Sequence, residues 1–537
     1  MKNDKISSTK IKNYHTFIIW SVLLATLPVV ICLIRFLATG DSFAEIWPAG
    51  STWNDEAFYF KQTEGIVTHG VPQGYFGYNE SRAQLLSFGA WVPIILAPQA
   101  LFGKIFGFGV FTPFIFNICI MACSLLIFGL LTRIELGAMS SIYLSLFVFI
   151  PLSRFTFSYM PEIMIISLCI VLFGLYLSAA EKPHFVKDLL MYLILVYLVI
   201  LRPYLAVLFL FPVMAAFRRR GKTKLLFIFL CLLCIGAALW GYSFFTDKFT
   251  APYMEDIYTD WFHKVFTHGP RTVYNEVMER LRYNFALMGF RMQQSVDSLD
   301  AVGGYYTVYI ILSFMVLLSS PITLLSVKLQ ASEEEKSNPS TYQKVFLYIL
   351  VFLAQATVLL AIAALYNIAD GYRHLICFIV LDILLLLSEK NIFASFKFFS
   401  VGVCIVLSVF FFLVKGDIPD SYSIPTMDLK DPKRTELALS QEKLKKEMPL
   451  TEGISWDNTV DVMYLPEADL GVYYAVPTGF GINMCSGSFL EENASSLKSG
   501  FIIIPSGDPL ADILSRSGYV KLTDITGGYS VYKRPDR

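Results

Sequence analysis

The sequence predicts a mostly α-helical, polytopic membrane protein with a small α/β domain at its C-terminal end. Of its 537 residues, 55% are hydrophobic and only 16% are charged, whereas a soluble domain has about 25% charged residues. Apolar runs close to the roughly 20 residues needed to cross a bilayer recur between residues 15 and 414. After about residue 415 the sequence becomes polar, and short β-type runs then alternate with helical stretches.

The apolar runs predict a transmembrane helical bundle of about eleven spans. These are residues 15–37, 108–131, 138–156, 161–180, 186–201, 204–217, 223–245, 304–327, 345–365, 375–388 and 393–414. Segment 83–102 is also apolar, but it contains Pro93 and Pro98. We expect this segment to lie along the membrane interface as a broken helix rather than to cross.

The basic loops indicate whether segment 83–102 crosses the membrane, because short cytoplasmic loops are enriched in Lys and Arg. If segment 83–102 does not cross, the basic loops all fall on the side of the N-terminus; the densest contains Arg218, Arg219, Arg220 and Lys222. The first apolar run is too long for a signal peptide and has no small-residue cleavage site, which predicts an uncleaved anchor. We therefore expect a multi-pass protein of the cell membrane with a cytoplasmic N-terminus and an extracytoplasmic C-terminal domain.

This topology predicts a division of the chain into three parts. Residues 1–415 form the membrane domain, whose larger outer loops are 38–107 and 246–303. Residues 416–453 form a linker, and residues 454–537 form the small extracytoplasmic α/β domain. Within the last two parts, the pattern predicts a charged helix at 431–446, a buried strand at 501–504, a helix at 509–517, and strands at 519–522 and 529–533.

Two adjacent carboxylates, Asp55 and Glu56, follow the first span at the predicted outer surface. Trp53, Phe58 and Tyr59 surround them in the sequence. Aromatic neighbours at an interface would partly desolvate a carboxylate and raise its pKa, which suits a general base. The alternative is an ordinary solvated acidic pair.

Further polar residues at span ends fall on the same predicted outer face. Glu162 opens a span, where an acid stabilises the helix dipole by about 0.3–1 kcal/mol without any other role. Arg202 with Tyr204, and Arg373 with His374, also lie at span ends. Arginines there either extend to the interface or face a polar cavity, where they could bind a phosphate through two hydrogen bonds.

Other classes of site find little support in the sequence. The 43 basic and 43 acidic residues balance, which gives no reason to expect a nucleic-acid partner. Eight of the nine cysteines lie in apolar runs, where they behave as small hydrophobes. No metal-ligand spacing and no phosphate-binding glycine loop is present, so we predict no metal or cofactor, with a divalent cation left open. Residues 275–288 of the second large loop predict a basic amphipathic surface helix.

Transfer of a sugar from a polyprenyl phosphate to a hydroxyl would use such residues. The leaving group is already a stable anion, so the reaction needs a base for the acceptor hydroxyl and cations for the developing phosphate charge. A carboxylate with arginines on the outer leaflet meets these needs. A lipid-linked donor also suits a compartment that has no nucleotide sugars.

The arrangement resembles the GT-C superfamily of membrane glycosyltransferases, close to the protein O-mannosyltransferase and aminoarabinose-transferase group. The matching features are Asp55-Glu56 in the first outer loop, the apolar segment 83–102, Pro161-Glu162 and Arg373-His374. The resemblance implies an inverting transferase of hexosyl or pentosyl groups in which Asp55 or Glu56 is the base, with Asp55 favoured as the first acid. The His-Pro-Pro-Leu stretch common in the family is replaced here by residues 78–84, which include Arg82 as a supporting site residue.

The predicted function is therefore transfer of a sugar from a polyprenyl-phosphate donor to a cell-envelope glycan, lipid or protein. Arg202, Arg373 and His374 would bind the donor phosphate, and Glu162, Tyr204 and Arg82 would support them. A polysaccharide polymerase or ligase of the Wzy/WaaL type is one alternative, since loop 246–303 is rich in Arg and His. A flippase or transporter of lipid-linked saccharides, and a non-catalytic assembly scaffold, are the others. A transporter is expected to have charges within its spans and internal repeats, whereas the ionisable residues here cluster at span ends.

Overall fold

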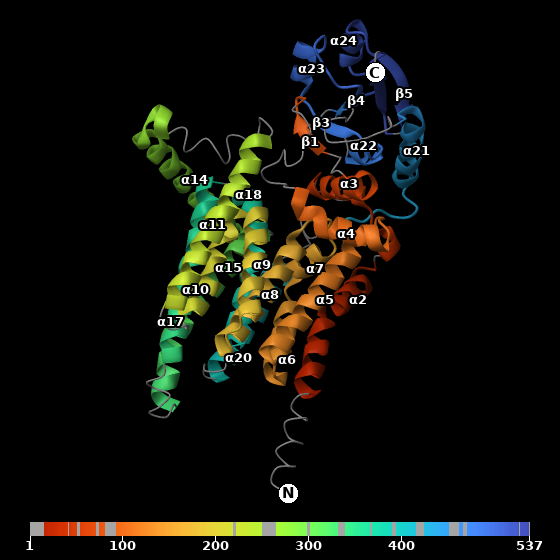
Figure 1. Ribbon diagram of the computed structural model, residues 1–537. Helices are drawn as coiled ribbons and strands as arrows, with labels where there is room; N and C mark the ends of the chain where they lie inside the picture. Colours follow the sequence, from red (N-terminus) through yellow and green to blue (C-terminus); the bar gives the residue numbers. More distant parts are fainter. Residues whose placement is uncertain are drawn as a thin grey trace.

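The computed structural model consists of a helical bundle with a sheet-containing domain above one end of it (Figure 1). It describes residues 15–40, 42–50, 54–70, 75–80, 93–217, 222–249, 265–297, 301–330, 339–365, 368–388, 394–414, 424–449, 461–464, 470–525 and 527–535. The first bundle helix begins at the end remote from the sheet. The mostly α-helical membrane fold with a small C-terminal α/β domain is therefore confirmed.

Within these ranges, seven helices are long and apolar enough to cross a membrane. The first lies at His15–Ala38 and overlaps α2 (Leu27–Thr39). The others are α5 (Thr112–Thr132), α8 (Glu162–Glu181), α11 (Lys222–Phe249), α15 (Ala301–Gln330), α17 (Pro339–Leu365) and α20 (Ala394–Val409). Helix α20 continues into the π-helix η7 (Phe410–Val414). Helices α6 (Leu136–Phe147) and α7 (Ile150–Thr156) are bent by 72° and would make an eighth span if counted together.

The remaining three predicted spans are shorter helices packed among the long ones. They are α9 (Phe185–Leu201), the pair η4 (Pro203–Phe209) and α10 (Leu210–Phe217), and α19 (Ile376–Ser388). Helix α19 is buried along almost its whole length. The predicted number of eleven spans thus stays a prediction, since seven or eight helices satisfy both length and composition.

One ionisable side chain lies in the middle of a buried bundle helix, contrary to the expectation that such residues are confined to helix ends. Asp382 of α19 is fully buried, and Gln355 of α17 donates to its Oδ1 over 2.5 Å. The sequence pattern missed this acid because a single polar residue barely lowers the hydropathy of a run such as 376–388.

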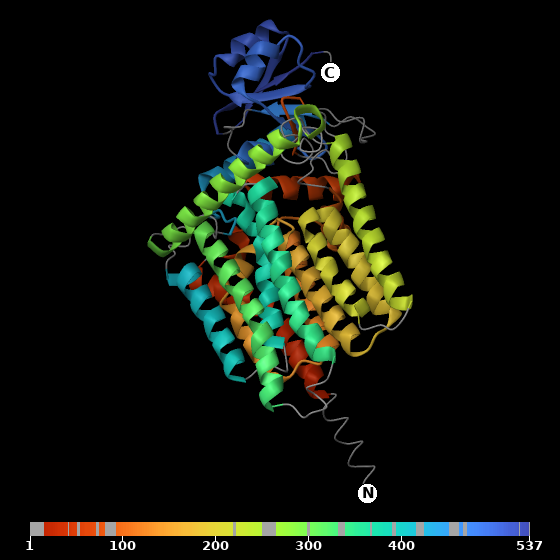
Figure 2. The ribbon, with the colours of Figure 1, turned by 90° about the vertical axis from the view of Figure 1, so that its left-hand side faces the viewer.

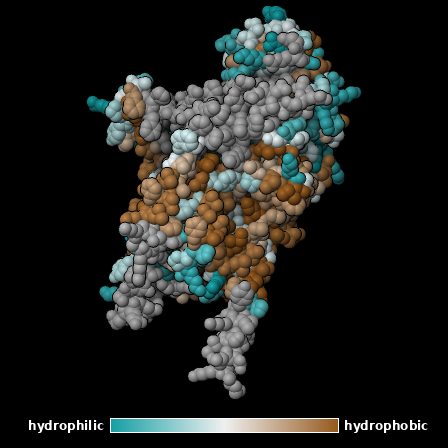
Figure 3. Space-filling model, in the orientation of Figure 1, coloured by the Kyte–Doolittle hydropathy of each residue, from teal (hydrophilic) through white to brown (hydrophobic). Residues whose placement is uncertain are grey.

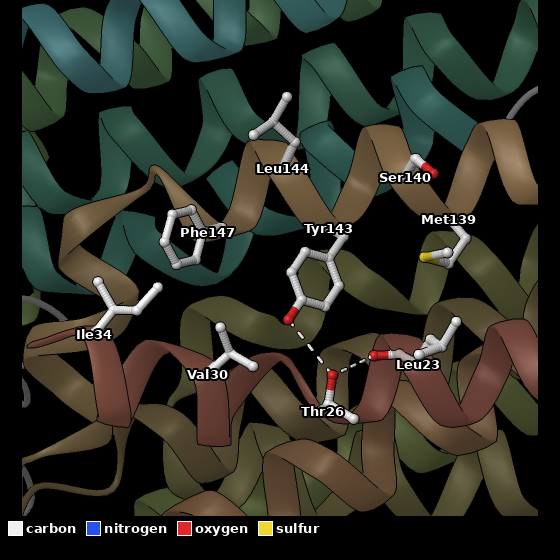
Figure 4. A pocket seen from close by; sticks show the side chains of 9 residues that line it. All are labelled: Leu23, Thr26, Val30, Ile34, Met139, Ser140, Tyr143, Leu144 and Phe147. Atoms are coloured by element: carbon white, nitrogen blue, oxygen red, sulfur yellow. Dashed lines mark hydrogen bonds between the residues drawn. The ribbon is translucent and has the colours of Figure 1, made fainter.

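On the face shown in Figure 3, apolar residues cover much of the described middle of the bundle, and polar residues are common on the sheet domain. One groove of about 400 Å³ opens on this surface between α2 and α6 (Figure 4). Across this groove, the hydroxyl groups of Thr26 and Tyr143 form a hydrogen bond of 3.4 Å. The Thr26 hydroxyl also donates to the Leu23 carbonyl. Apart from these groups and Ser140, the groove offers hydrocarbon surface.

Short elements cap the bundle beneath the sheet domain. The turns η1 (Phe43–Glu45) and η2 (Pro48–Gly50) lead to α3 (Asn54–His69), which lies across the end of the bundle (Figure 1). Next come η3 (Pro93–Leu96) and α4 (Ala97–Phe106), the described part of the segment expected at the interface. Figure 2 shows α14 (Pro270–Asp297) running obliquely across the same end. This helix contains the predicted surface helix 275–288.

The C-terminal domain is built on a six-stranded sheet in the order β1-β3-β2-β4-β6-β5. Its strands are β1 (Tyr75–Tyr78), β2 (Asp461–Tyr464), β3 (Gly481–Met484), β4 (Phe501–Pro505), β5 (Val520–Ile525) and β6 (Tyr529–Lys533); β1 to β4 pair in parallel, and β6 pairs antiparallel with both β4 and β5. Helices α21 (Pro432–Glu447), α22 (Leu470–Ala475), α23 (Gly487–Asn493) and α24 (Leu510–Arg516) accompany it.

The charged helix, the buried strand and the last two strands of this domain agree with the sequence prediction. Strand β1 was not predicted: it comes from the first outer loop and pairs with β3, Tyr75 lying opposite Ile482. The domain boundaries stay a prediction, but the first outer loop and the C-terminal residues share one sheet.

Candidate active site

Helix α3 places the two adjacent carboxylates in its first turn, where both stabilise the helix dipole. Successive helical residues point about 100° apart. Asp55 and Glu56 therefore face different parts of the molecule and have different partners.

Asp55 faces an arginine that lies 318 positions later in the sequence. Arg373 lies in the short helix η6 (Tyr372–Leu375), between α18 (Ile368–Gly371) and α19. Its Nη1 donates to Asp55 Oδ2 over 2.5 Å and lies 3.8 Å from the Met160 sulfur. The two charged side chains are only 12% and 14% exposed. Asp55 is thus a nearly buried carboxylate whose charge is balanced by a single described arginine.

Glu56 is fully buried, and both of its oxygens accept hydrogen bonds. Oε1 accepts from Arg154 Nη2 at 2.8 Å and from the Ser158 hydroxyl at 2.9 Å. Oε2 accepts from the Tyr159 backbone N–H at 2.6 Å. This carboxylate fixes α3 against α7 and the loop after it, so its hydrogen-bonding capacity is used within the protein.

A second acid and a second arginine lie beside the first pair. Glu162 occupies the first turn of α8, and Arg202 follows the last residue of α9; Arg202 Nη2 lies 3.6 Å from Glu162 Oε1. Both side chains are at most 8% exposed. Within the described ranges neither carboxylate oxygen of Glu162 has a hydrogen-bond partner. This carboxylate and guanidinium face each other at a distance longer than a direct hydrogen bond.

Tyr59, one turn after Asp55 on α3, shows that the two pairs form one cluster. Burial raises the pKa of its hydroxyl, and the charged groups close enough to act on it are Arg202, Glu162, Asp55 and Arg373. Four of the six charged residues predicted for the site therefore lie near one tyrosine; Glu56 has other partners, and Arg82 lies outside the described residues. Tyr59 itself was noted in the sequence only as an aromatic neighbour.

Tyr204 and His374 line the edge of this cluster, with their ring centroids 5.2 Å apart. Burial lowers the pKa of His374 well below its usual value of 6.5, and the nearby Arg202 and Arg373 lower it further. The imidazole is therefore neutral at physiological pH. It could donate a hydrogen bond to a phosphate but would add no charge.

Arg82 and the expected absence of a metal site both stay predictions. Arg82 lies outside the described residues, as does its surrounding stretch 81–92. Among the residues that are described, no group of three or more His, Cys, Asp or Glu side chains is arranged to hold a metal ion. Arg154 was not predicted at all; its only signal was a basic residue near the end of an apolar run.

Comparisons with known proteins give a distant structural match. No protein-family model matches the chain, and no curated protein matches its sequence. Among solved structures, ArnT from Cupriavidus metallidurans bound to undecaprenyl phosphate is similar at a TM-score of 0.40 and 10% identity, over 96% of this chain and 98% of that one. The apo structure of the same protein gives 0.40 and 9%, over 94% and 97%.

At this TM-score and identity, the likeness bears on neither the activity nor the substrate of this chain. Both must be inferred from the site itself.

Proposed function

We propose that the protein is a membrane glycosyltransferase that moves a sugar from a polyprenyl phosphate to a hydroxyl of a cell-envelope acceptor, with inversion at the anomeric carbon. The observation that supports this most directly is the cluster of Asp55, Glu162, Arg202 and Arg373 around Tyr59. Two guanidinium groups and two carboxylates at one end of a membrane bundle match the charge requirements of this reaction.

Each charged group has a role in the proposed reaction. Asp55 accepts the proton of the acceptor hydroxyl as its oxygen attacks the anomeric carbon, and the bond from that carbon to the phosphate oxygen breaks. Arg373 and Arg202 stabilise the negative charge that develops on the phosphate, which a nearly water-free site makes more effective. The phosphate leaves as an anion, so no acid needs to protonate it.

The contact between Arg373 and Asp55 relates the base to the donor. Before the donor binds, Arg373 balances the charge of Asp55. A phosphate that enters the cluster competes for the same guanidinium, and the carboxylate then regains basicity. Glu162 lies beside Arg202 and orients the guanidinium of this second arginine.

The proposal places this cluster at the extracytoplasmic surface. Arg133 follows α5 and Lys182 follows α8. Helix α8 starts at Glu162 and has 20 residues, which at 1.5 Å per residue is about 30 Å, the thickness of a bilayer core. Its basic end is therefore one bilayer away from the cluster, as the positive-inside rule requires for a cytoplasmic loop.

Replacement of Asp55 tests the proposed function. We expect Asp55→Asn to lower the turnover of a polyprenyl-phosphate sugar by at least about 10²–10⁴-fold, the usual contribution of a general base. The measurement is release of polyprenyl phosphate and formation of glycosylated product by protein in lipid nanodiscs. Asp512→Asn is the matched control, because Asp512 is an exposed acid on α24 at the far side of the sheet domain. Full activity of Asp55→Asn would contradict the mechanism and favour a polymerase or ligase of the Wzy/WaaL type.

A lipid-linked saccharide transporter is the second candidate, and Asp382 favours it because an ionisable residue within a span often marks a transport pathway. Its surroundings argue against a pathway, however. The cavity beside Asp382 and Gln355 measures only about 10 Å³, and its other lining residues are apolar. A transporter would move the lipid-linked sugar across the membrane of a closed vesicle without forming a new glycosidic bond. Analysis of the products formed by the protein in vesicles therefore separates a transporter from a transferase.

A further inference from the structure

A second cluster of buried charged residues lies on the side of α3 away from Asp55. Lys61 and Glu64 are six and nine positions after Asp55, which rotates them by roughly 240° and 180° around the helix. Lys61 is 1% exposed, and its Nζ donates to Glu64 Oε2 over 2.9 Å. Lysine is almost never fully buried unless it is paired, so this contact has a specific structural role.

The C-terminal domain completes this cluster. The hydroxyl of Thr478, in the turn between α22 and β3, donates to the same Glu64 oxygen. Lys61 Nζ lies 3.4 Å from the Thr478 hydroxyl and 5.7 Å from the centre of the Tyr474 ring. We call Lys61, Glu64 and Thr478 the α3 clasp. It is a charged contact between the helix of the proposed base and the sheet domain.

Aromatic side chains surround the α3 clasp. Phe58 of α3 packs edge-on against Tyr473 of α22 with ring centroids 4.6 Å apart. Phe60 lies 5.9 Å from Tyr474, whose ring also contacts Trp47 at 5.3 Å. Apolar contacts of this kind favour burial but allow sliding, whereas the charged hydrogen bonds of the clasp fix one rotation of the helix.

The chain after α3 is attached to the same domain. Strand β1 pairs with β3. Glu80 then accepts hydrogen bonds from the Lys498 and Ser499 backbone N–H groups, each 2.7 Å long. The segment from α3 to Glu80 is therefore held by the C-terminal domain at its helix and at its end.

We propose that the C-terminal domain positions the base: the α3 clasp sets the rotation of α3 at which Asp55 meets Arg373. Lys61, Glu64 and Thr478 act as positioning residues and do not touch the substrate. This inference rests on the proposed function. It gives the sheet domain a part in turnover, although none of its described residues lies in the charged cluster around Tyr59.

The test uses Thr478→Val in the full-length protein, which keeps the side-chain shape and removes the hydroxyl. We expect turnover to fall roughly 10- to 100-fold, because a displacement of about 1 Å at a reacting group has effects of this size. The KM for the donor should stay within twofold, since Arg202 and Glu162 lie on other helices. Backbone amides of residues 54–69 should exchange with deuterium several-fold faster, and Thr478→Ser should restore both properties.

Thr523→Val is the matched control, because Thr523 lies on β5, at the opposite edge of the sheet from β1. Lys61→Met tests the clasp from the α3 side and should reproduce the effect of Thr478→Val. The inference is overturned if Thr478→Val behaves like Thr523→Val, or if it changes donor KM and turnover by the same factor. If Asp55→Asn retains activity, the proposed function fails while the exchange of residues 54–69 still decides whether the clasp positions α3.

Discussion

Two neighbouring acids of α3 have separate roles because of helix geometry. Asp55 lies in the charged cluster with Arg373, whereas Glu56 is enclosed by Arg154, Ser158 and the Tyr159 N–H. Among the described residues the first carboxylate has one charged hydrogen-bond partner, whereas the second accepts three hydrogen bonds. Asp55 is therefore expected to affect turnover, and Glu56 is expected to affect the stability of the fold.

Removal of Arg154 tests this division. Arg154→Met would leave Glu56 buried without its counter-charge, and breaking such a pair destabilises a protein by about 3–5 kcal/mol. We expect a clearly lower unfolding temperature of the purified protein in detergent, and a smaller decrease for Asp55→Asn, because the Asp55–Arg373 pair is more exposed than the Arg154–Glu56 pair and an asparagine oxygen can still accept from Arg373. An Arg154→Met protein that unfolds normally but loses turnover as Asp55→Asn does would show instead that this arginine acts in the reaction.

The residues of the site could be predicted in part from the sequence. Asp55, Glu162, Arg202 and Arg373 were all marked by charge at the ends of apolar runs, and the structure brings them together. Tyr59 and Arg154 were missed, because which face of a helix a residue occupies depends on its packing partners. The charged neighbours of Tyr59 come from α3 itself, α8, η6 and the residue after α9, and Arg154 of α7 pairs with Glu56 of α3; no local pattern connects α3 with these other segments.

At the level of elements, close helix packing supports the end of the bundle where the site lies. Gly303 of α15 lies directly against the Arg291 backbone carbonyl of α14, so a Cβ at this position would collide with it. Helix α14 also contacts α17, where Asn284 donates to the Ala363 carbonyl over 2.7 Å. The glycine thus permits the approach of α14 to the bundle.

Gly303→Ala is expected to destabilise the protein by about 1–3 kcal/mol, the usual cost of overpacking. Gly289→Ala is the control on α14, because nothing lies within 4 Å of the added Cβ; alanine there should be neutral or stabilise by up to about 1 kcal/mol. Thermal unfolding of both variants measures the difference. Equal unfolding temperatures would show that α14 moves away from α15 at little cost.

The α3 clasp should depend on pH through Glu64. Burial alone would raise the pKa of Glu64, but Lys61, Thr478 and His69 lower it overall below the ordinary value of 4.5. Tyr474 also faces this carboxylate. A lowered folded-state pKa means that the ionised group stabilises the fold above about pH 4.5, and that this contribution is lost as the pH falls through the folded-state pKa.

We therefore expect Glu64→Gln to unfold at a lower temperature than the wild type at neutral pH, by an amount that corresponds to roughly 1.5–3 kcal/mol. The difference in unfolding temperature between the two proteins should remain constant down to about pH 5. It should narrow below pH 4.5, where the wild-type carboxylate becomes protonated. Unfolding temperatures of both proteins between pH 7 and pH 3.5 measure this. A gap that widens in acid would reverse the sign of the proposed contribution.

At the scale of the whole molecule, composition was sufficient to predict the class, the helical bundle and the separate C-terminal domain. The number of spans was less accessible, because α9, α19 and the bent pair α6–α7 are apolar like spans but short or broken. Burial in a large bundle and burial in lipid select the same residues, so hydropathy alone does not separate them. Strand β1 was missed for a similar reason: a strand of four residues gains its partner only from the far end of the chain.

That pairing has a consequence for how the protein is made. Strand β1 ends at Tyr78 and its partner β3 begins at Gly481, and closing so long a loop is slow. During synthesis, β1 and α3 leave the ribosome early but have no partner strand until residues 481–484 have been translated and have reached the same compartment. An unfinished chain that ends before residue 481 therefore lacks the partner strand of β1, and the pairing of β1 with β3 can form only late in translation.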